Sequence, residues 1–333
     1  MNIVIIGAGI GGLCLAQGLN RAGIPATVYE HGYDQNQGWR LSVKQDGSQA
    51  LRECLPDELF NEIRAGAIAP AVRLVFTDHL LNPKFSKPIP AIEGHFGISR
   101  QRLRDLLTTG LDVRFGKQCV GLSGNTVSFA DGSTATGDLI VGADGTRSTI
   151  RAQVLPEAAF EDLGSALYGV TPFSTLDWVP DVLVDTFNRI TDPAGTSMAI
   201  ATCRPGDYFT WTITPADGAI EDWHPAVRRI VAEASTTFPI QLHSALPVQL
   251  WHDPHVTLLG DAIHTMTPGR GDGANTALRD ARLLTTVLAE VAAGRVPLGP
   301  AKKLYEQEML RYGFEAVAAS RSMPFTPRSG ALS

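Results

Sequence analysis

The first thirty residues hold the pattern that most constrains the fold of this chain. An apolar run, Ile3–Ile6, leads into Gly7-x-Gly9-x-x-Gly12, a helical pattern follows, and a second apolar run ends at Glu30. In a βαβ unit the first glycine makes a tight turn, the second lets the backbone approach a pyrophosphate, and the third lets helix and strand pack closely. The helix start offers N–H groups, and the acid accepts hydrogen bonds from a ribose. This glycine motif, the first loop, predicts a dinucleotide site in an α/β fold rather than an incidental turn.

A second pattern occupies the middle of the chain. Val127 and Phe129 alternate with polar residues up to Asp131-Gly132, which is a good hairpin signal. The apolar stretch DLIVGA then ends at Asp144, and a short helix or loop begins near Ser148. Open α/β sheets bind ligands at the carboxyl ends of their strands, so Asp144 is a candidate ligand contact. The alternative is an Asx-turn, in which the carboxylate bonds only its own backbone.

A third pattern, GDAIHTMTPGRGDGAN, spans residues 260–275. The apolar run VTLL leads into Asp261, and a proline and three spaced glycines precede a long helical pattern with an apolar stripe. Glycine-rich turns that open a helix usually hold an anion. We call residues 268–275 the second loop.

Composition excludes several classes of function. A net charge of −6 and a pI near 5.8 argue against a nucleic-acid partner or a stable association with an anionic membrane. No basic leader precedes the first strand and no apolar run is long enough to span a bilayer, so we expect a soluble, cytoplasmic protein. The four cysteines lie far apart without metal-ligand spacing, which favours buried thiols and no metal site: Cys14, Cys54, Cys119 and Cys203.

Together the three patterns resemble the fingerprints of one family. The first loop, GADGTRSTIR and GDAIHTMTPGRGDGAN occur in the order found in FAD-dependent aromatic-hydroxylase-type monooxygenases, the single-component class resembling para-hydroxybenzoate hydroxylase. The match runs, with gaps, from Met1 to about Ala293. It implies FAD as cofactor and NAD(P)H as co-substrate. It also implies O2 addition to give a flavin C4a-hydroperoxide, which hydroxylates or epoxidises an aromatic or polycyclic small molecule.

FAD explains why the chain has two glycine-rich loops. NAD would leave the second loop unused, whereas the AMP half of FAD fits the first loop and its ribityl-isoalloxazine half can reach the second. The resemblance implies that Asp261 bonds the ribityl chain, that Arg100 in ISRQRLRDLL touches the pyrophosphate region, and that Asp144 lies near both dinucleotides. The expected cofactor-binding residues are Gly7, Gly9, Gly11, Gly12, Glu30, Arg40, Arg100, Val120, Asp144, Asp261, Gly271, Gly273, Ala274 and Asn275.

Individual residues near the flavin carry alternatives. Amides at the start of the helix from Ala274 can face the N1/C2 edge of the flavin, where reduced flavin is negative. Pro268 is a candidate for a rigid wall on the reactive side, or a simple turn proline. Arg40 is a candidate for a phosphate or ribose contact, or a surface arginine. His95 is a candidate pocket residue, and we interpret His264 as packed and hydrogen-bonded rather than catalytic.

The expected fold class is α/β, with a Rossmann-like FAD-binding domain of the GR2 type and an inserted antiparallel-sheet substrate domain. The FAD-binding domain is expected at residues 1–70, 99–160 and 251–295, the substrate domain at 71–98 and 161–250, and a helical tail at 296–333. The chain is expected to be a monomer or homodimer. Aromatic residues of the substrate domain either line the pocket or form core, namely Phe173, Phe187, Phe209 and Trp211, and Tyr168 and Arg189 are further pocket candidates.

Other readings of the patterns stay open. A FAD-dependent reductase or dehydrogenase without oxygen insertion would use the same cofactor site. So would a flavin-binding cyclase or scaffold, and a FAD-dependent halogenase shares the scaffold. An NAD dehydrogenase explains neither Asp261 nor the second loop.

Overall fold

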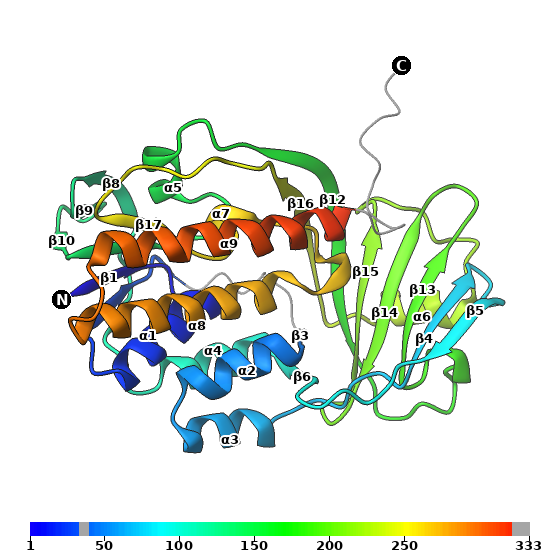
Figure 1. Ribbon diagram of the computed structural model, residues 1–333. Helices are drawn as coiled ribbons and strands as arrows, with labels where there is room; N and C mark the ends of the chain where they lie inside the picture. Colours follow the sequence, from blue (N-terminus) through cyan, green and yellow to red (C-terminus); the bar gives the residue numbers. More distant parts are fainter. Residues whose placement is uncertain (33–39, 322–333) are drawn as a thin grey trace.

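The computed structural model describes residues 1–32 and 40–321 and contains two main sheets (Figure 1). The first is parallel, with strand order β17-β11-β1-β2-β7. Its strands are β1 (Ile3–Ile6), β2 (Ala26–Tyr29), β7 (Val113–Arg114), β11 (Leu139–Gly142) and β17 (Val256–Leu258). The residues of β1, β11 and β17 are all buried, as expected for parallel strands covered on both faces.

Helices cover this parallel sheet. They are α1 (Ile10–Arg21), α2 (Gln45–Cys54), α3 (Asp57–Ala65), α4 (Arg100–Thr108), α5 (Thr149–Val154), α7 (Asp261–His264), α8 (Gly273–Ala292) and α9 (Leu298–Arg321). Helix α8 packs on α1 and α2, and α9 packs on α8. The expected tail helix, α9, contributes Tyr305, Met309 and Tyr312 to the same hydrophobic core as β1 and α1. Residues 322–333 of the expected tail lie outside the described residues.

Two smaller sheets extend this part of the molecule. One consists of β8 (Cys119–Ser123), β9 (Thr126–Phe129) and β10 (Thr134–Thr136), and it contains the hairpin predicted at Asp131-Gly132. The other pairs β3 (Arg40–Val43) with β6 (Phe96–Ser99) in antiparallel register, so Arg40 lies opposite Ser99. This register brings Arg40 close to Arg100, the first residue of α4.

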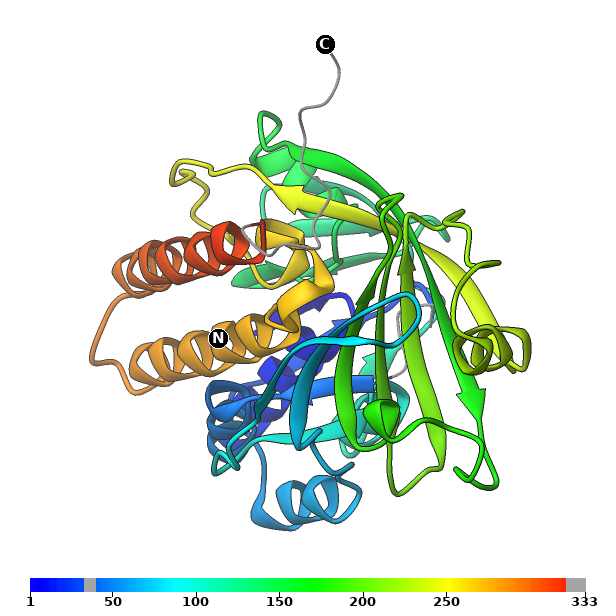
Figure 2. The same ribbon diagram turned by 90° about the vertical axis from the view of Figure 1, so that its right-hand side faces the viewer.

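The second main sheet has seven strands in the order β16-β12-β15-β14-β13-β4-β5. They are β4 (Arg73–Asp78), β5 (Pro83–Pro88), β12 (Phe160–Pro172), β13 (Thr186–Thr191), β14 (Ser197–Cys203), β15 (Tyr208–Thr214) and β16 (Thr236–Ala245). The expectation of an antiparallel sheet needs one correction, because β13 and β4 pair in parallel. Helix α6 (Pro225–Ala232) and the short η1 (Asp181–Leu183) pack on one face, away from α8 and α9 (Figure 2).

The aromatic pocket candidates separate onto the two faces of this sheet. Phe209 and Trp211 are 0% and 1% exposed and belong to the core under α6, and Phe173 packs against it. Of the two alternatives for these three side chains, pocket or core, the structure shows core. Residues of a strand alternate between faces, so Phe187 and Arg189 lie on the opposite face, which we call the inner face. The period of two in the sequence predicts that side chains alternate between the faces of the sheet, but it does not predict which face α6 covers.

The division of the chain into two domains remains our proposal. The strands of the seven-stranded sheet lie within residues 71–98 and 161–250, except that β12 begins one residue earlier, at Phe160. The strands of the parallel sheet come from the remaining segments. Separate hydrophobic clusters lie in the two parts, one around β1, α1 and α8 and the other between the seven-stranded sheet and α6.

Candidate functional site

Each glycine of the first loop is needed for its own physical reason. Gly7 has a φ of +110°, and a Cβ there would lie 2.3 Å from the carbonyl oxygen of Ala143 on the neighbouring strand. A Cβ on Gly12 would lie 2.3 Å from the oxygen of Gly7. A Cβ on Gly9 would meet nothing within 4 Å. Gly7 and Gly12 therefore allow close packing, and the space over Gly9 fits the approach of a pyrophosphate.

Gly11 and Glu30 complete the first loop. A Cβ on Gly11 would lie 2.4 Å from Leu259 Cδ2, so this glycine allows α1 to pack against the end of β17. Glu30 Oε2 accepts a hydrogen bond of 2.6 Å from the amide of Ala8, and Oε1 accepts one of 2.8 Å from the amide of Gly32. The carboxylate is thereby held beside the loop, at the place where the motif expects a ribose.

The contacts of Asp144 fit both alternatives considered for it, the turn and the ligand contact. Its Oδ2 accepts hydrogen bonds from the amides of Thr149 (2.7 Å) and Ile150 (3.3 Å), which fits the turn alternative. Its Oδ1 is buried without a hydrogen-bond partner in the part of the chain that the structure describes. Burial raises the pKa of Asp144, and, with Asp144 nearby, burial raises the pKa of Cys119 to about 11. Val120, next to Cys119, is 53% exposed.

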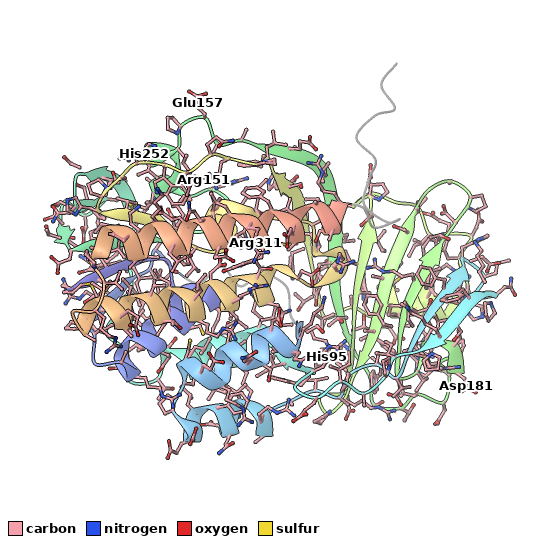
Figure 3. All side chains as sticks on the ribbon, viewed as in Figure 1. His95, Arg151, Glu157, Asp181, His252 and Arg311 are labelled. Atoms are coloured by element: carbon pink, nitrogen blue, oxygen red, sulfur yellow. The ribbon has the colours of Figure 1, made fainter. Side chains whose placement is uncertain are left out.

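Arg151 joins the second motif to the third, a role that the sequence reasoning missed. The side chain is 8% exposed, and its Nη1 and Nη2 donate to the carbonyls of Ala262 (2.8 Å) and Thr146 (2.7 Å). The hydroxyls of Thr146 and Thr265 are 2.9 Å apart. Arg151 lies on α5 and is labelled in Figure 3. Arg151 is the last residue of the GADGTRSTIR motif, but its partner Ala262 lies 111 residues further along the chain, where no local pattern reveals it.

Asp261 is the exposed first residue of α7. It follows Gly260, whose φ of +65° and ψ of −141° favour glycine. No hydrogen bond to the Asp261 carboxylate comes from the described residues, and a Cβ on Gly273 would lie 3.9 Å from its Oδ1. The carboxylate is therefore open to a ligand beside the start of α8.

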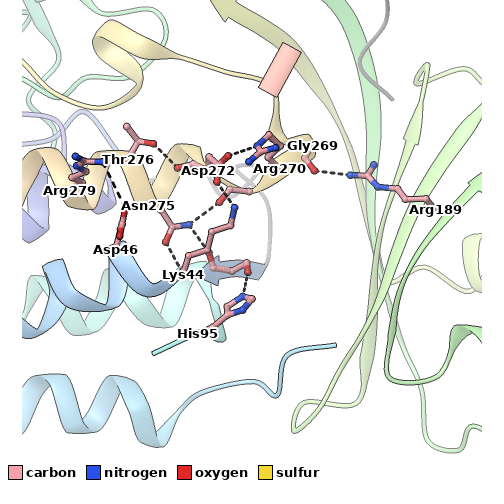
Figure 4. A network of polar contacts seen from close by, with 12 residues as sticks. Lys44, Asp46, His95, Arg189, Gly269, Arg270, Asp272, Asn275, Thr276 and Arg279 are labelled. Carbon is pink, nitrogen blue, oxygen red and sulfur yellow. Dashed lines mark hydrogen bonds and ion pairs between the residues drawn. The ribbon is translucent and has the colours of Figure 1, made fainter. Parts of the chain in front are cut away.

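The second loop ends in a helix start held by side chains. Pro268–Arg270 is a short 3-10 turn, Gly271 has a φ of +67°, and α8 begins at Gly273. Asn275 Nδ2 donates to the carbonyls of Ser42 and Gly271, both at 2.8 Å, and its Oδ1 accepts from the amide of Lys44 at 2.7 Å (Figure 4).

The first turn of α8 leaves backbone donors for a ligand. The amides of Gly273, Ala274 and Asn275 donate to no backbone carbonyl of the described chain, as is usual at a helix start. The side-chain amide of Asn275 bonds Lys44 and Ser42 and so connects β3 to α8. Only the backbone amide of Asn275 is therefore left for a cofactor. Pro268 is exposed and opens the 3-10 turn, which fits both readings of that residue.

Charged side chains surround the second loop. Asp272 pairs with Lys44 and accepts a hydrogen bond of 2.8 Å from Arg270 Nε. Burial alone would raise the pKa of Asp272, but these hydrogen bonds outweigh it and lower that pKa. From the inner face, Arg189 Nη2 donates to the carbonyl of Gly269 at 2.8 Å (Figure 4). Burial lowers the pKa of Arg189 to about 10.

His95 lies where the seven-stranded sheet meets the rest of the molecule (Figure 3). Its Nε2 is 2.8 Å from Ser42 Oγ, and burial together with the charges of Lys44 and Arg40 lowers its pKa. Arg40 is partly buried, and its Nε has no hydrogen-bond partner among the described residues. Burial raises the pKa of Tyr208 on β15, and the positive charge of Arg40 opposes this rise, so Arg40 lies near Tyr208.

The packed interpretation of His264 is confirmed. The side chain is 0% exposed, and its Nε2 lies 2.7 Å from Asp280 Oδ2. Burial would lower the pKa of His264, but Asp280 and Asp261 raise it above its usual value.

These residues fit FAD at one edge of the parallel sheet. Ala143 touches Gly7 and Leu259 touches Gly11, so the ends of β1, β11 and β17 meet there. That edge combines open space over Gly9, an unpartnered oxygen of Asp144 and an exposed Asp261. Within residues 1–32 and 40–321, no cluster of three His, Cys, Asp or Glu is arranged for a metal, and no helix is long and apolar enough to cross a membrane.

Comparisons with known proteins agree with this chemistry. The family model described as "FAD binding domain" matches residues 105–300. The dual O-methyltransferase/FAD-dependent monooxygenase elcB of Phaeosphaeria nodorum is 30% identical, and the match covers 87% of this chain and 40% of elcB. The chain spans about two-fifths of the length of the first three curated relatives that it matches.

Solved structures are similar over nearly the whole chain. One, assigned as a FAD-containing monooxygenase from Photorhabdus luminescens, is 31% identical with a TM-score of 0.82, and the match covers 96% of both chains. Another is Klebsiella pneumoniae HpxO in complex with FAD and uric acid, 25% identical with a TM-score of 0.81, covering 96% of this chain and 87% of HpxO.

Proposed function

The chain belongs to the FAD-binding monooxygenase family, and from that premise we propose that it uses NAD(P)H and O2 to hydroxylate or epoxidise an aromatic or polycyclic small molecule. The observation that carries the proposal is the exposed Asp261 carboxylate beside the first amides of α8, on the sheet edge that also carries the first loop. Two anion- and ribose-type sites on one edge suit a long cofactor better than NAD.

The first loop would hold the AMP half of FAD. The space over Gly9 admits the pyrophosphate, and Glu30 stands beside it to accept hydrogen bonds from the ribose. The unpartnered Asp144 Oδ1 gives the same edge a further acceptor. Arg40, Arg100 and Val120 remain proposed contacts.

The second loop would hold the flavin half. Asp261 would accept hydrogen bonds from the ribityl chain, and the amides of Gly273, Ala274 and Asn275, at the start of α8, would bind the pyrimidine edge. A helix start favours an anion by about 0.3–1 kcal/mol, and by up to about 2 kcal/mol where partly buried. Bound FAD supplies the electron transfer and the oxygen activation; the chain supplies position and charge.

The substrate would bind between the inner face and the second loop. Tyr168 stacks on Phe238 on that face, with ring centroids 5.2 Å apart, and the Arg189 guanidinium lies 5.0 Å from the Phe187 ring. Aromatic faces and a guanidinium suit a flat, electron-rich substrate. His95, kept neutral by its lowered pKa, can accept a proton there, and Pro268 is the proposed wall. HpxO, which was solved with uric acid, takes a flat heterocycle of this kind.

The test starts with the purified protein, which is expected to be yellow. NADH and NADPH oxidation in air is then followed with a panel of phenolic, polycyclic and heterocyclic compounds. The proposal predicts substrate-dependent O2 uptake and a product heavier by one oxygen atom. Oxidation of NAD(P)H without a heavier product across the panel would favour the reductase alternative.

A substitution tests the site itself. Asp261→Ala is expected to lose FAD or turnover, because the ribityl chain loses its acceptor. Asp217→Ala is the matched control, since Asp217 is exposed in a turn of the other sheet. Flavin content and turnover that are both unchanged in Asp261→Ala would contradict the assignment.

A further inference from the structure

The short helix α7 is held from inside by one buried carboxylate. Asp280 on α8 is 0% exposed, and its Oδ2 accepts from the amide of Gly260 at 2.9 Å and lies 2.7 Å from His264 Nε2. Its Oδ1 accepts from the hydroxyl of Tyr312 on α9 at 2.7 Å. Three donors, from the residue before α7, from its last residue and from α9, therefore meet at a single side chain.

Helix α9 closes this arrangement. The hydroxyl of Tyr305 donates to the carbonyl of Leu258, the last residue of β17, at 2.8 Å. A Cβ on Gly313 would lie 2.7 Å from His264 Cδ2, so glycine is what lets α9 approach the imidazole. The end of β17 is thus hydrogen-bonded to α9, and the end of α7 packs closely against it.

Asp261 lies in the chain between Gly260 and His264, two of the residues that contact Asp280. Gly260 precedes it, with its amide bonded to Asp280, and the amide of His264 donates to the carbonyl of Gly260 at 3.0 Å. Ala262 and Ile263 are buried, so Asp261 is the exposed residue of the turn. Any movement of the Gly260 amide or the His264 ring would redirect the Asp261 carboxylate.

Stability alone does not explain a charged group at this depth. Replacing a fully buried ion pair by well-packed apolar groups is often neutral or stabilising, because desolvation offsets the attraction. A buried pair can instead select one geometry among several of similar packing. Here the geometry selected is that of α7.

We propose that Asp280 is a positioning residue for the cofactor: through the Gly260 amide and His264 it holds the Asp261 carboxylate in the place where FAD meets it. The inference rests on the proposed function only in taking Asp261 as a ligand of the ribityl half of FAD. It assigns a role to three buried side chains, Asp280, His264 and Tyr312.

The test is a double-mutant cycle on FAD binding, with Asp280→Asn, Asp261→Asn and the double variant. FAD and ADP dissociation constants are measured by fluorescence and calorimetric titration, because ADP probes the first loop alone. Asp280→Asn is expected to weaken FAD by about tenfold and to leave ADP binding unchanged. The double variant is expected to bind FAD no more weakly than Asp261→Asn, since Asp280 acts through Asp261. Additive losses, or parallel losses of FAD and ADP affinity, would overturn the proposal.

Two further variants separate positioning from general stability. Tyr312→Phe removes one donor and keeps the carboxylate, so a smaller selective loss of FAD affinity, about threefold, is expected even if Asp280→Asn does not fold. Glu306→Gln breaks the buried Lys302–Glu306 pair within α9, whose Nζ and Oε1 atoms are 2.7 Å apart. It is expected to lower Tm and leave FAD binding unchanged. An equal loss of FAD affinity in Glu306→Gln would overturn the inference.

The outcome is distinguishable from failure of the proposed function. A wild-type chain that binds no FAD refutes the cofactor site and this inference together. A wild-type chain that binds FAD but never inserts oxygen refutes only the monooxygenase activity, and the cycle still decides the role of Asp280.

Discussion

The two glycine-rich loops reach the same sheet edge by different physical means. In the first loop, Gly7, Gly11 and Gly12 are required because any Cβ would collide with Ala143, Leu259 or Gly7 itself. In the second loop, a Cβ on Gly271 or Gly273 would meet nothing closer than 3.7 Å. There the shape comes from side-chain hydrogen bonds and ion pairs. The first loop is thus defined by volume and the second by polar contacts.

This difference decides how each loop can be broken. An added side-chain atom should damage the first loop, because its shape depends on close packing rather than on charged side chains. Removed hydrogen bonds or altered pH should damage the second loop, where Lys44 and Arg270 both pair with the Asp272 carboxylate. The following predictions test this contrast, from the largest expected effect to the smallest.

Adding one methyl group to the first loop should have the largest effect. Gly12→Ala places a Cβ 2.3 Å from a backbone oxygen, so we expect a loss of about 3 kcal/mol in the free energy of unfolding. Gly9→Ala is the matched control, because Gly9 has φ −71° and ψ 173° and open space around it. It should keep the wild-type stability in urea unfolding yet weaken FAD by about tenfold. Equal stability of the two variants would contradict the volume argument.

Removing the side-chain hydrogen bonds of Asn275 in the second loop should have the next largest effect. Asn275→Ala leaves the amide of Lys44 and the carbonyl of Ser42 without their partner, so we expect a loss of about 2 kcal/mol in urea unfolding and weaker FAD binding. Asn125→Ala, which loses one bond to Gly137 in the small hairpin sheet, should cost less and leave FAD binding intact. If Asn275→Ala matched the wild type in both measurements, side chains would not hold this loop.

The carboxylate of Asp272 should make the second loop sensitive to acid. Its folded-state pKa is lowered, so its contribution to stability is present above the ordinary value of 3.8 and is lost as pH falls through the lowered pKa. Asp272→Asn should therefore bind FAD about threefold more weakly at pH 7 and lower Tm there. The Tm values of variant and wild type should converge in acid. A difference that persists unchanged below pH 3 would contradict the role of the charge.

The smallest effect is expected at His95. Its pKa is lowered in the folded state, so the folded chain binds fewer protons than the unfolded chain below about pH 6.5, and stability should rise with pH through that window. His95→Gln should reduce the rise in Tm between pH 5 and pH 7. His252→Gln, at an exposed position, is the control and should leave the rise unchanged. A full rise in His95→Gln would contradict the assignment.

Local patterns predicted the local elements well. The strand Ile3–Ile6 and the hairpin at Asp131-Gly132 are confirmed, and the long helix begins at Gly273, one residue before the expected Ala274. The first helix is longer at its start than expected, because it begins at Ile10 inside the glycine motif, and it ends at Arg21. These features depend on near neighbours in the chain, where periodicity and turn residues carry the information.

Contacts between distant segments were not predictable. Arg151 bonds Ala262 across 111 residues, and Asn275 bonds Lys44 across 231. For the same reason the sequence left the aromatic side chains of β15 open between pocket and core, since alternation cannot tell which face α6 covers. Each depends on which elements pack together, and a single sequence does not encode that in any local signal.

The sequence by itself determined the chemistry of the two loops, the order of the motifs and the family resemblance, because each of these depends on residue types at short spacings. Only the tertiary structure decided that Asp280, Tyr312 and Arg151 converge on the turn carrying Asp261. It also decided that Gly7, Gly11 and Gly12 are required by packing while Gly271 and Gly273 are not. The physical reason is that burial, steric contact and hydrogen bonding act between atoms close in space, whatever their separation along the chain.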